Sequence, residues 1–175
     1  MSIAVPILVV VLGTFAVPGL MLAPWVPTKR KDYARIAALL ELGPEDRLVE
    51  FGCGAGGLLA YLARTTEATL LGIELSPVPW LAARLRAWRV GSPKLRIRFG
   101  DAFVFSLTDS SAAYVFAVPD RMPALKEKFA ELPLRARVVS YVFPIDGWVS
   151  DAEDAPPGRM PIYRYRVADQ RKPRT

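Results

Sequence analysis

Two hydrophobic periods alternate along the chain after residue 31. Strand-like patterns, either continuous apolar runs or strict alternation, occupy residues 47–51, 68–73, 95–99, 112–118 and 136–143. Apolar residues spaced three or four apart, as on one face of a helix, occupy residues 32–42, 58–63, 78–88 and 122–132. Strands that alternate with helices are joined by right-handed crossovers, which gives a parallel sheet with helices on both faces. The pattern therefore predicts a doubly wound α/β fold.

The pattern changes after residue 143. Asp146-Gly147 and Pro156-Pro157-Gly158 are turn signals, and residues 162–167 (Ile-Tyr-Arg-Tyr-Arg-Val) alternate strictly. This alternation predicts a final antiparallel strand at or near the edge of the sheet.

The helix predicted around residues 78–88 divides into two faces. The apolar face, expected to point into the core, consists of Val78, Leu81, Leu85 and Trp88, and Trp80 is expected to be buried with it. The basic face, expected to be solvated, consists of Arg84, Arg86 and Arg89.

The first 28 residues carry no charged side chain, and Lys29-Arg30-Lys31 follows them. From Ile3 to Val26 the segment has roughly the length needed to cross a ~30 Å hydrocarbon core as a helix. Because the positive charges come after the apolar run, the positive-inside rule places the rest of the chain in the cytoplasm. The sequence thus predicts an N-terminal hydrophobic membrane anchor over residues 1–28, a folded domain over 29–175, and a single-pass membrane protein. A cleaved signal peptide and a hydrophobic helix docked on the domain are the alternatives.

Composition narrows the possible chemistry. The chain has no histidine, which removes the commonest general base and the commonest metal ligand, and one cysteine, which excludes a disulfide framework and a CxxC metal site. We therefore expect no metal. The net charge is +6, with basic clusters near both ends, yet no aromatic-and-basic recognition motif supports nucleic-acid binding. Such basic ends are typical of a solvated surface or of a segment that is attracted to anionic lipid headgroups.

The segment Leu48-Val-Glu-Phe-Gly-Cys-Gly-Ala-Gly-Gly57 carries the strongest chemical signal. A predicted strand runs into closely spaced glycines, and a predicted helix begins behind them. Glycines are needed where the backbone turns sharply and a ligand approaches without a Cβ in the way. Gly52, Gly54 and Gly57 also fit the dinucleotide pattern GxGxxG, so this loop alone does not choose a cofactor.

Three acidic residues indicate which cofactor the loop binds. Glu50 stands where a pyrophosphate would be repelled and an aminoacyl group attracted, and Glu74 ends the next strand, where a carboxylate can take both ribose hydroxyls. Asp101 follows the third strand and can accept from an adenine amino group. Acids at successive strand ends lie in the crevice where open α/β sheets bind ligands. A nicotinamide enzyme would also need a substrate domain, for which no residues remain.

This arrangement resembles the class I S-adenosylmethionine-dependent methyltransferases over residues 28–167. Residues 50–56 match that family's first motif, Glu74 its second, and Asp101 the motif beside adenine. The resemblance implies S-adenosyl-L-methionine as cofactor and a Rossmann-like sheet. The residues that it implies for cofactor binding are Glu50, Gly52, Cys53, Gly54, Gly56, Glu74, Leu75, Asp101 and Ala102. We expect Cys53 to be a small packing residue rather than a nucleophile.

A narrower resemblance involves the apolar N-terminal segment followed by Trp25-Val-Pro-Thr28, and residues 137–148 (Arg-Val-Val-Ser-Tyr-Val-Phe-Pro-Ile-Asp-Gly-Trp). These features are similar to the small membrane-anchored protein-lysine methyltransferases, whose eukaryotic members modify mitochondrial targets including the ATP synthase c-subunit. The family pattern places the segment before the first helix and Val118-Pro119 near the substrate lysine. Glu50 replaces the more usual Asp, and residues 117–120 (Ala-Val-Pro-Asp) lack the Asn-Pro-Pro-Tyr signature of amide and adenine methylases.

The leading hypothesis is therefore a protein-lysine N-methyltransferase that acts on a membrane-proximal protein. We expect Asp120 and Tyr141 to orient the acceptor, and Phe143 and Trp148 to line its channel. Desolvation and the sulfonium charge would lower the pKa of the acceptor lysine, so that no dedicated base is required. The alternatives are a methyltransferase for a lipid or another apolar small molecule, and a scaffold that binds the cofactor without catalysis.

Overall fold

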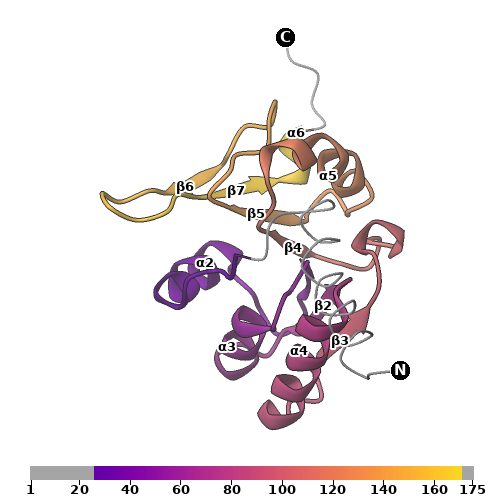
Figure 1. Cartoon of the computed structure of the whole chain (residues 1–175). Helices are drawn as coiled ribbons and strands as arrows, with labels where there is room; N and C mark the ends of the chain where they lie inside the picture. The colour runs from indigo at the N-terminus through magenta and orange to yellow at the C-terminus, as the bar shows by residue number, and fades with distance from the viewer. Residues whose placement is uncertain (1–25, 171–175) are drawn as a thin grey trace, which may run out of the picture.

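A seven-stranded sheet forms the centre of the computed structural model, which describes residues 26–170 (Figure 1). Its strands are β1 (Arg47–Phe51), β2 (Thr69–Glu74), β3 (Leu95–Phe99), β4 (Ala112–Val115), β5 (Arg137–Tyr141), β6 (Ala152–Asp154) and β7 (Ile162–Arg166). They lie in the order β3-β2-β1-β4-β5-β7-β6. Strands β1 to β5 are parallel, and β7 is antiparallel to both of its neighbours. The sheet is the mixed, doubly wound α/β arrangement that the hydrophobic pattern predicts.

The edge of the sheet contains one strand that the hydrophobic pattern did not predict. The alternating segment forms the predicted antiparallel strand near the edge, β7, which lies between β5 and β6. The edge strand is β6, only three residues long, and its partly exposed Ala-Glu-Asp sequence has no hydrophobic period that would reveal it. The chain reverses once between residues 154 and 162 and so pairs β6 with β7, and this pairing does not depend on a hydrophobic pattern within β6.

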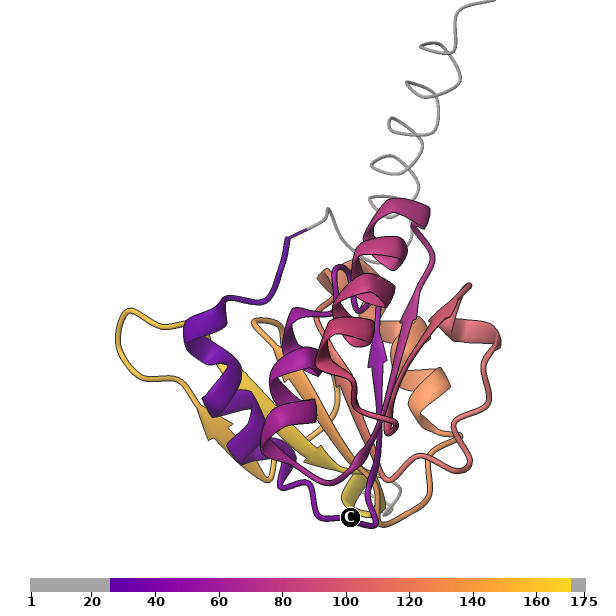
Figure 2. The same cartoon turned by 90° about the horizontal axis from the view of Figure 1, so that it is seen from below.

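Helices cover both faces of the sheet (Figure 2). One face carries α2 (Tyr33–Leu40), α3 (Gly57–Thr65) and α4 (Pro77–Val90), and the other carries α5 (Met122–Phe129). Short helices complete the chain: η1 (Arg30–Asp32), η2 (Ala102–Val104), η3 (Pro119–Arg121) and α6 (Val167–Gln170). On the first face Leu40 and Leu59 pack against the sheet, and on the second Leu125 and Phe129 do so. Side chains of the buried parallel strands alternate between these two cores.

Helix α4 presents a different face to the core from the one expected. Its buried residues are Pro79 and Ala83, while the predicted apolar face is exposed, with Trp88 76% accessible. The reason is close packing: a Cβ on Gly56 would lie 3.1 Å from the Cβ of Ala83, so only a small side chain fits where α4 crosses the glycine loop. Trp80 is half-buried and stacks edge-on against Phe99, with ring centroids 5.5 Å apart.

The predicted localisation is corrected. The longest helix between residues 26 and 170 is α4, with 14 residues, and none in that range is both long and apolar enough to cross a membrane. The single-pass membrane localisation, with a cytoplasmic catalytic domain, was therefore wrong as a conclusion from the sequence. That prediction was based on the hydrophobic segment 1–28, of which residues 1–25 lie outside the described part of the chain. The domain boundary at residue 29 stays a prediction.

Candidate active site

The glycine loop follows β1 directly and turns the chain into α3. Gly54 and Gly56 have φ values of 54° and 69°, in the left-handed region that favours glycine. Gly56 is the N-cap of α3 and packs against α4, so a side chain there would be strained and crowded at once. The loop therefore presents backbone without side chains toward the ends of the strands.

A pocket of about 1040 Å³ opens at the carboxyl ends of β1, β2 and β4. Its size is at the upper end of the range for small-molecule sites, which leaves room for a cofactor and part of an acceptor. The expected cofactor residues that line it are Glu50, Gly52, Cys53, Gly54, Glu74, Leu75, Asp101 and Ala102. Gly56 does not line the pocket, and the neighbouring Gly57 takes its place. The pocket therefore lies in the crevice that the positions of the strand ends predict.

Glu50 is a buried carboxylate at the centre of this pocket. Its side chain is 5% accessible, and no donor among residues 26–170 reaches Oε2. Burial raises the pKa of Glu50 well above its usual value, and the charge of Glu74 raises it further. A buried acceptor without a partner is costly, so the site is suited to a cationic donor. The ammonium group of the methionine portion of S-adenosylmethionine is a donor of that kind.

Glu74 and Asp101 are already fixed by backbone donors. Glu74 accepts from the N–H of Gly54 through Oε2 and from the N–H of Ser76 through Oε1, both at 2.8 Å. Asp101 accepts from the N–H of Phe103 at 2.9 Å and so caps η2. Because a carboxylate oxygen can accept more than one hydrogen bond, both groups can still receive ribose hydroxyls and an adenine amino group. The residues present fit the cofactor.

Cys53 lies in the same loop but has no features of a nucleophile. Its thiol is buried, and a Cβ on Gly72 would lie 2.8 Å from its sulfur. Burial, with smaller contributions from Glu50 and Glu74, raises the pKa of the Cys53 thiol well above its usual value. The thiol therefore stays protonated and packs against β2.

Aromatic side chains line the pocket beside the expected cofactor residues. Tyr33 and Tyr61 lie with ring centroids 5.8 Å apart, and Tyr114 and Phe116 line the pocket from β4 and the residue just beyond it. Burial and the charge of Glu50 raise the pKa values of Tyr33 and Tyr114, so both hydroxyls remain protonated at neutral pH. The acidic residues lining the pocket within the described chain are Glu50, Glu74 and Asp101. Among the described residues the pocket is therefore lined by no further carboxylate that could act as a base.

Two tyrosine hydroxyls hold the segment before α2 against the sheet. The hydroxyls of Thr28 and Tyr114 share a hydrogen bond of 2.8 Å. The Tyr141 hydroxyl donates to Oδ2 of Asp32 at 2.7 Å, and the backbone of Lys29 forms a hydrogen bond with the same hydroxyl. Since Thr28 and Lys29 line the pocket, this segment forms one of its walls.

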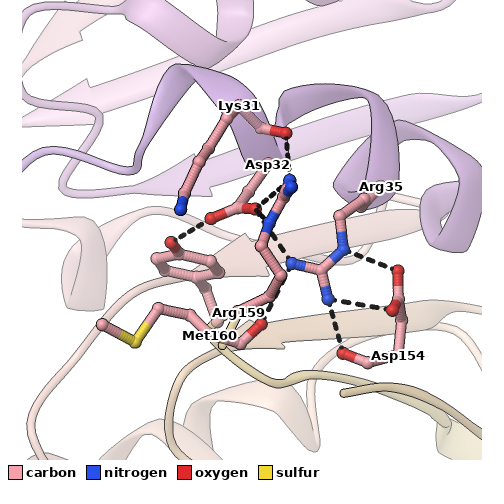
Figure 3. Close-up of polar contacts among 7 residues, drawn as sticks. Lys31, Asp32, Arg35, Asp154, Arg159 and Met160 are labelled. Atoms are coloured by element: carbon pink, nitrogen blue, oxygen red, sulfur yellow. Dashed lines mark hydrogen bonds and ion pairs between the residues drawn. The ribbon is translucent and has the colours of Figure 1, made fainter. Parts of the chain in front are cut away.

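Asp32 is the centre of a buried polar cluster behind this wall (Figure 3). Its Oδ1 accepts from Nη1 of Arg35 at 2.9 Å and from Nη2 of Arg159 at 2.9 Å, while Arg35 also binds both carboxylate oxygens of Asp154. Burial alone would raise the pKa of Asp32, but the hydrogen bonds from Tyr141, Arg35 and Arg159 lower it to about 2. The cluster thus ties the pocket wall to β6 and to the loop before β7.

The residues expected beside the acceptor are not gathered around the pocket. Asp120 lies exposed in η3, and the Tyr141 hydroxyl faces Asp32 behind the wall. Trp148 packs against Phe129 and Tyr165 on the opposite face of the sheet, and Phe143 belongs to that same core. None of these four side chains lines the main pocket.

The sequence interpretation missed other pocket residues. Arg86 and Arg89, expected on a solvated face, line the pocket from α4, and Tyr61 and Arg64 line it from α3. Gly57, Tyr61 and Arg64 are spaced to share one helix face. That spacing could have indicated the face once α3 was known to begin at the glycine loop.

The fold and the pocket together define a class of enzyme. A doubly wound sheet with an antiparallel β7, a glycine loop after β1 and acids after β2 and β3 are the features of a class I S-adenosylmethionine-dependent methyltransferase. Residues 50–152 match the family described as ANTKMT methyltransferase domain, and the chain belongs to that family. No group of three or more metal-binding side chains occurs within residues 26–170.

The chain is similar in sequence and in structure to several known methyltransferases. The chain is 34% identical over 140 residues to the adenine nucleotide translocase lysine N-methyltransferase of Mus musculus, covering 78% of this chain and 60% of that protein. A ribosomal RNA small subunit methyltransferase A of Geobacter sulfurreducens is 34% identical over 87 residues, which cover 50% of this chain and 30% of that protein. The structure resembles that of an RNA methyltransferase from Salinibacter ruber in complex with S-adenosyl-L-homocysteine, with a TM-score of 0.77 and 26% sequence identity. The match covers 81% of this chain and 94% of that one.

Proposed function

We propose that this methyltransferase transfers the methyl group to a lysine side chain of a protein. The aromatic side chains of Tyr33, Tyr61, Tyr114 and Phe116 in the pocket lining carry the proposal, because aromatic rings can pack along the apolar stem of lysine. The murine relative, a lysine N-methyltransferase, supports the same acceptor, although the chain spans only 60% of its length.

The chain's own residues can account for the required chemistry. S-adenosylmethionine, when bound, supplies the electrophilic methyl group, and Glu50, Glu74 and Asp101 are proposed to hold its ammonium, ribose and adenine groups. The acceptor must arrive as a neutral amine. Burial among aromatic rings, with Arg30 and Arg86 near Tyr33, lowers the pKa of a bound lysine and releases its proton to solvent. The wall at Thr28 and Lys29 then fixes the direction of approach, which is the main source of rate in such a displacement.

A second candidate acceptor is RNA, because the Salinibacter ruber structure and the Geobacter sulfurreducens sequence belong to RNA methyltransferases. Residues 117–120, Ala-Val-Pro-Asp, lack the Asn-Pro-Pro-Tyr signature of adenine methylases, which favours lysine. A lipid or another apolar small molecule remains the third acceptor class.

Incubating the protein with S-adenosylmethionine labelled in its methyl group and a cell extract would decide between these acceptors. Fractionation into protein, RNA and lipid locates the label, and acid hydrolysis of the protein fraction identifies methyl-lysine. We expect label in methyl-lysine, and none when Asp101→Ala is used at low cofactor concentration. Label in RNA or lipid alone would reject the lysine acceptor, and no transfer despite cofactor binding would indicate a scaffold.

A further inference from the structure

Five basic side chains line the mouth of the pocket. They come from the segment before α2, from α3 and from α4, and they are Lys29, Arg30, Arg64, Arg86 and Arg89. Four of them are exposed, and Arg86 is partly buried against the carbonyl oxygen of Ala55 in the glycine loop. We refer to these five residues as the cationic rim. Three separate elements contribute to it, so the rim is a product of the fold and not of one basic run in the sequence.

The cationic rim has no acidic counterpart in the described part of the chain. None of its five members forms an ion pair there, whereas Arg35, Arg159 and Arg164, away from the pocket, each bind a carboxylate. The three acids that line the pocket are Glu50, which is buried, and Glu74 and Asp101, which accept from backbone N–H groups. Like charges gathered at a pocket mouth raise the local concentration of an oppositely charged partner.

A lysine acceptor alone is poorly matched to this rim, because five cations repel a sixth. The mismatch disappears if the lysine is presented with acidic neighbours. We propose that the cationic rim binds acidic side chains that flank the acceptor lysine in a protein substrate. The inference rests on the proposed lysine methylation and adds the substrate class. The rim then has two effects: it attracts the acidic flanks, and it favours the neutral form of the amine between them.

The surface beside the rim favours a protein over RNA as the anionic partner. On α4, the exposed residues next to Arg86 and Arg89 are Leu85 and Trp88, and Leu81 and Val78 continue the same helix face. Val26 is also exposed and lines the pocket. Protein partners bury apolar and aromatic side chains of this kind, while nucleic-acid interfaces are more polar. An acidic protein segment with apolar residues nearby therefore matches both features of the surface.

Peptide substrates test the proposal directly. Three peptides would share one central lysine and differ only in their flanks, which carry glutamate, glutamine or arginine. We expect kcat/KM to fall by about three- to tenfold from acidic to neutral flanks at low salt, and again from neutral to basic. The differences should shrink as salt rises, because the screening length falls from ~10 Å at 0.1 M to ~3 Å at 1 M.

Charge reversal supplies the matched control. The double variant Arg64→Glu, Arg89→Glu should reverse the order of the three peptides. Arg96→Glu, Arg98→Glu changes the net charge equally on exposed β3, outside the pocket, and should preserve the order. Calorimetry with S-adenosylhomocysteine checks that each variant is folded, and if the double rim variant fails, Arg89→Gln alone should weaken the preference for acidic flanks.

The outcomes separate this inference from the proposed function. Methyl-lysine that forms at equal rates in all three peptides, or an order that the rim variant leaves unchanged, would overturn the rim assignment and leave lysine methylation intact. Label that enters RNA of the cell extract and no lysine would overturn both.

Discussion

The hydroxyl of Tyr141 donates a hydrogen bond to the carboxylate of Asp32 at 2.7 Å, although the two residues lie 109 positions apart in the chain. The bond joins the last residue of β5 to the end of η1, directly behind the wall formed by Thr28 and Lys29. Neither side chain lines the pocket. We therefore expect Tyr141, which the sequence placed beside the acceptor, to act on the reaction through the position of this wall.

Tyr141→Phe should lower kcat while the Kd for S-adenosylhomocysteine stays close to that of the wild type. The substitution removes the donor to Asp32 and should cost about 1–3 kcal/mol of unfolding free energy, because a buried acceptor loses one of its partners. Initial rates, calorimetry and urea unfolding measure the three effects. Tyr165→Phe is the matched control, since this buried hydroxyl accepts from the N–H of Ile145 on the other face of the sheet. Equal losses of stability and of kcat in both variants would reduce Tyr141 to a purely structural role.

Acid unfolding should depend on Asp32. Hydrogen bonds from Tyr141, Arg35 and Arg159 outweigh burial and lower the pKa of Asp32 from 3.8 to about 2. Since the pKa in the folded state is the lower one, the stabilisation is complete above pH ~4 and is lost as the pH falls toward ~2, an effect of about 2 kcal/mol. Urea unfolding between neutral and strongly acidic pH measures it.

In Asp32→Asn this loss on acidification should become smaller, although Asp46 and Asp154, whose pKa values are also lowered, still contribute to it. Asp120→Asn, at an exposed position in η3, should retain the pH profile of the wild type. If Asp32→Asn shows the full acid sensitivity of the wild type, the hydrogen bonds to Asp32 do not stabilise the fold in this way.

The fold could be predicted from the sequence because its central strands are buried on both faces and therefore read as apolar runs. The strand over residues 47–51 matches β1 for this reason, and the glycines behind it mark the start of α3. The same local pattern indicated three residues that line the pocket and are proposed to bind the cofactor, since Glu50, Glu74 and Asp101 each stand near or just beyond a strand end.

The aromatic lining proposed for the acceptor could not be predicted in the same way, because its residues are distant in the chain. Tyr33, Tyr61 and Phe116 come from three elements, and only the packing of α2 and α3 on the sheet brings them together. Likewise, helical spacing showed which residues of α4 share a face but not which face is buried. Ala83 against Gly56 determined that choice, and close packing of two backbones has no hydrophobic signal.

Two tryptophans should now behave differently from the sequence prediction. Trp148 packs between Phe129 and Tyr165, so Trp148→Ala should cost roughly 2–4 kcal/mol of unfolding free energy. Trp88 is 76% accessible, and Trp88→Ala should change the same quantity by less than about 0.5 kcal/mol. Urea unfolding compares them. If Trp148→Ala kept full stability and lost turnover on a lysine peptide, Trp148 would belong to the acceptor channel after all.

Cofactor affinity should be linked to the protonation of Glu50. Burial and the charge of Glu74 raise the pKa of Glu50, so at acidic pH the free protein carries a neutral carboxyl group there. The ammonium group of S-adenosylhomocysteine favours the charged form. Binding below the pKa of Glu50 must therefore release a proton, and affinity should rise with pH until that pKa is passed.

Glu50→Gln should weaken binding of S-adenosylhomocysteine by about 10- to 100-fold at neutral pH, the value of a charge-assisted hydrogen bond, and should remove this pH dependence. Calorimetry in two buffers of different ionisation enthalpy measures both the affinity and the proton released. Asp101→Asn is the control, because it alters the acceptor expected for the adenine amino group and leaves Glu50 in place, so affinity should fall but still rise with pH. A wild-type affinity that is flat across the acidic range, with no proton released, would show that Glu50 does not bind the ammonium group.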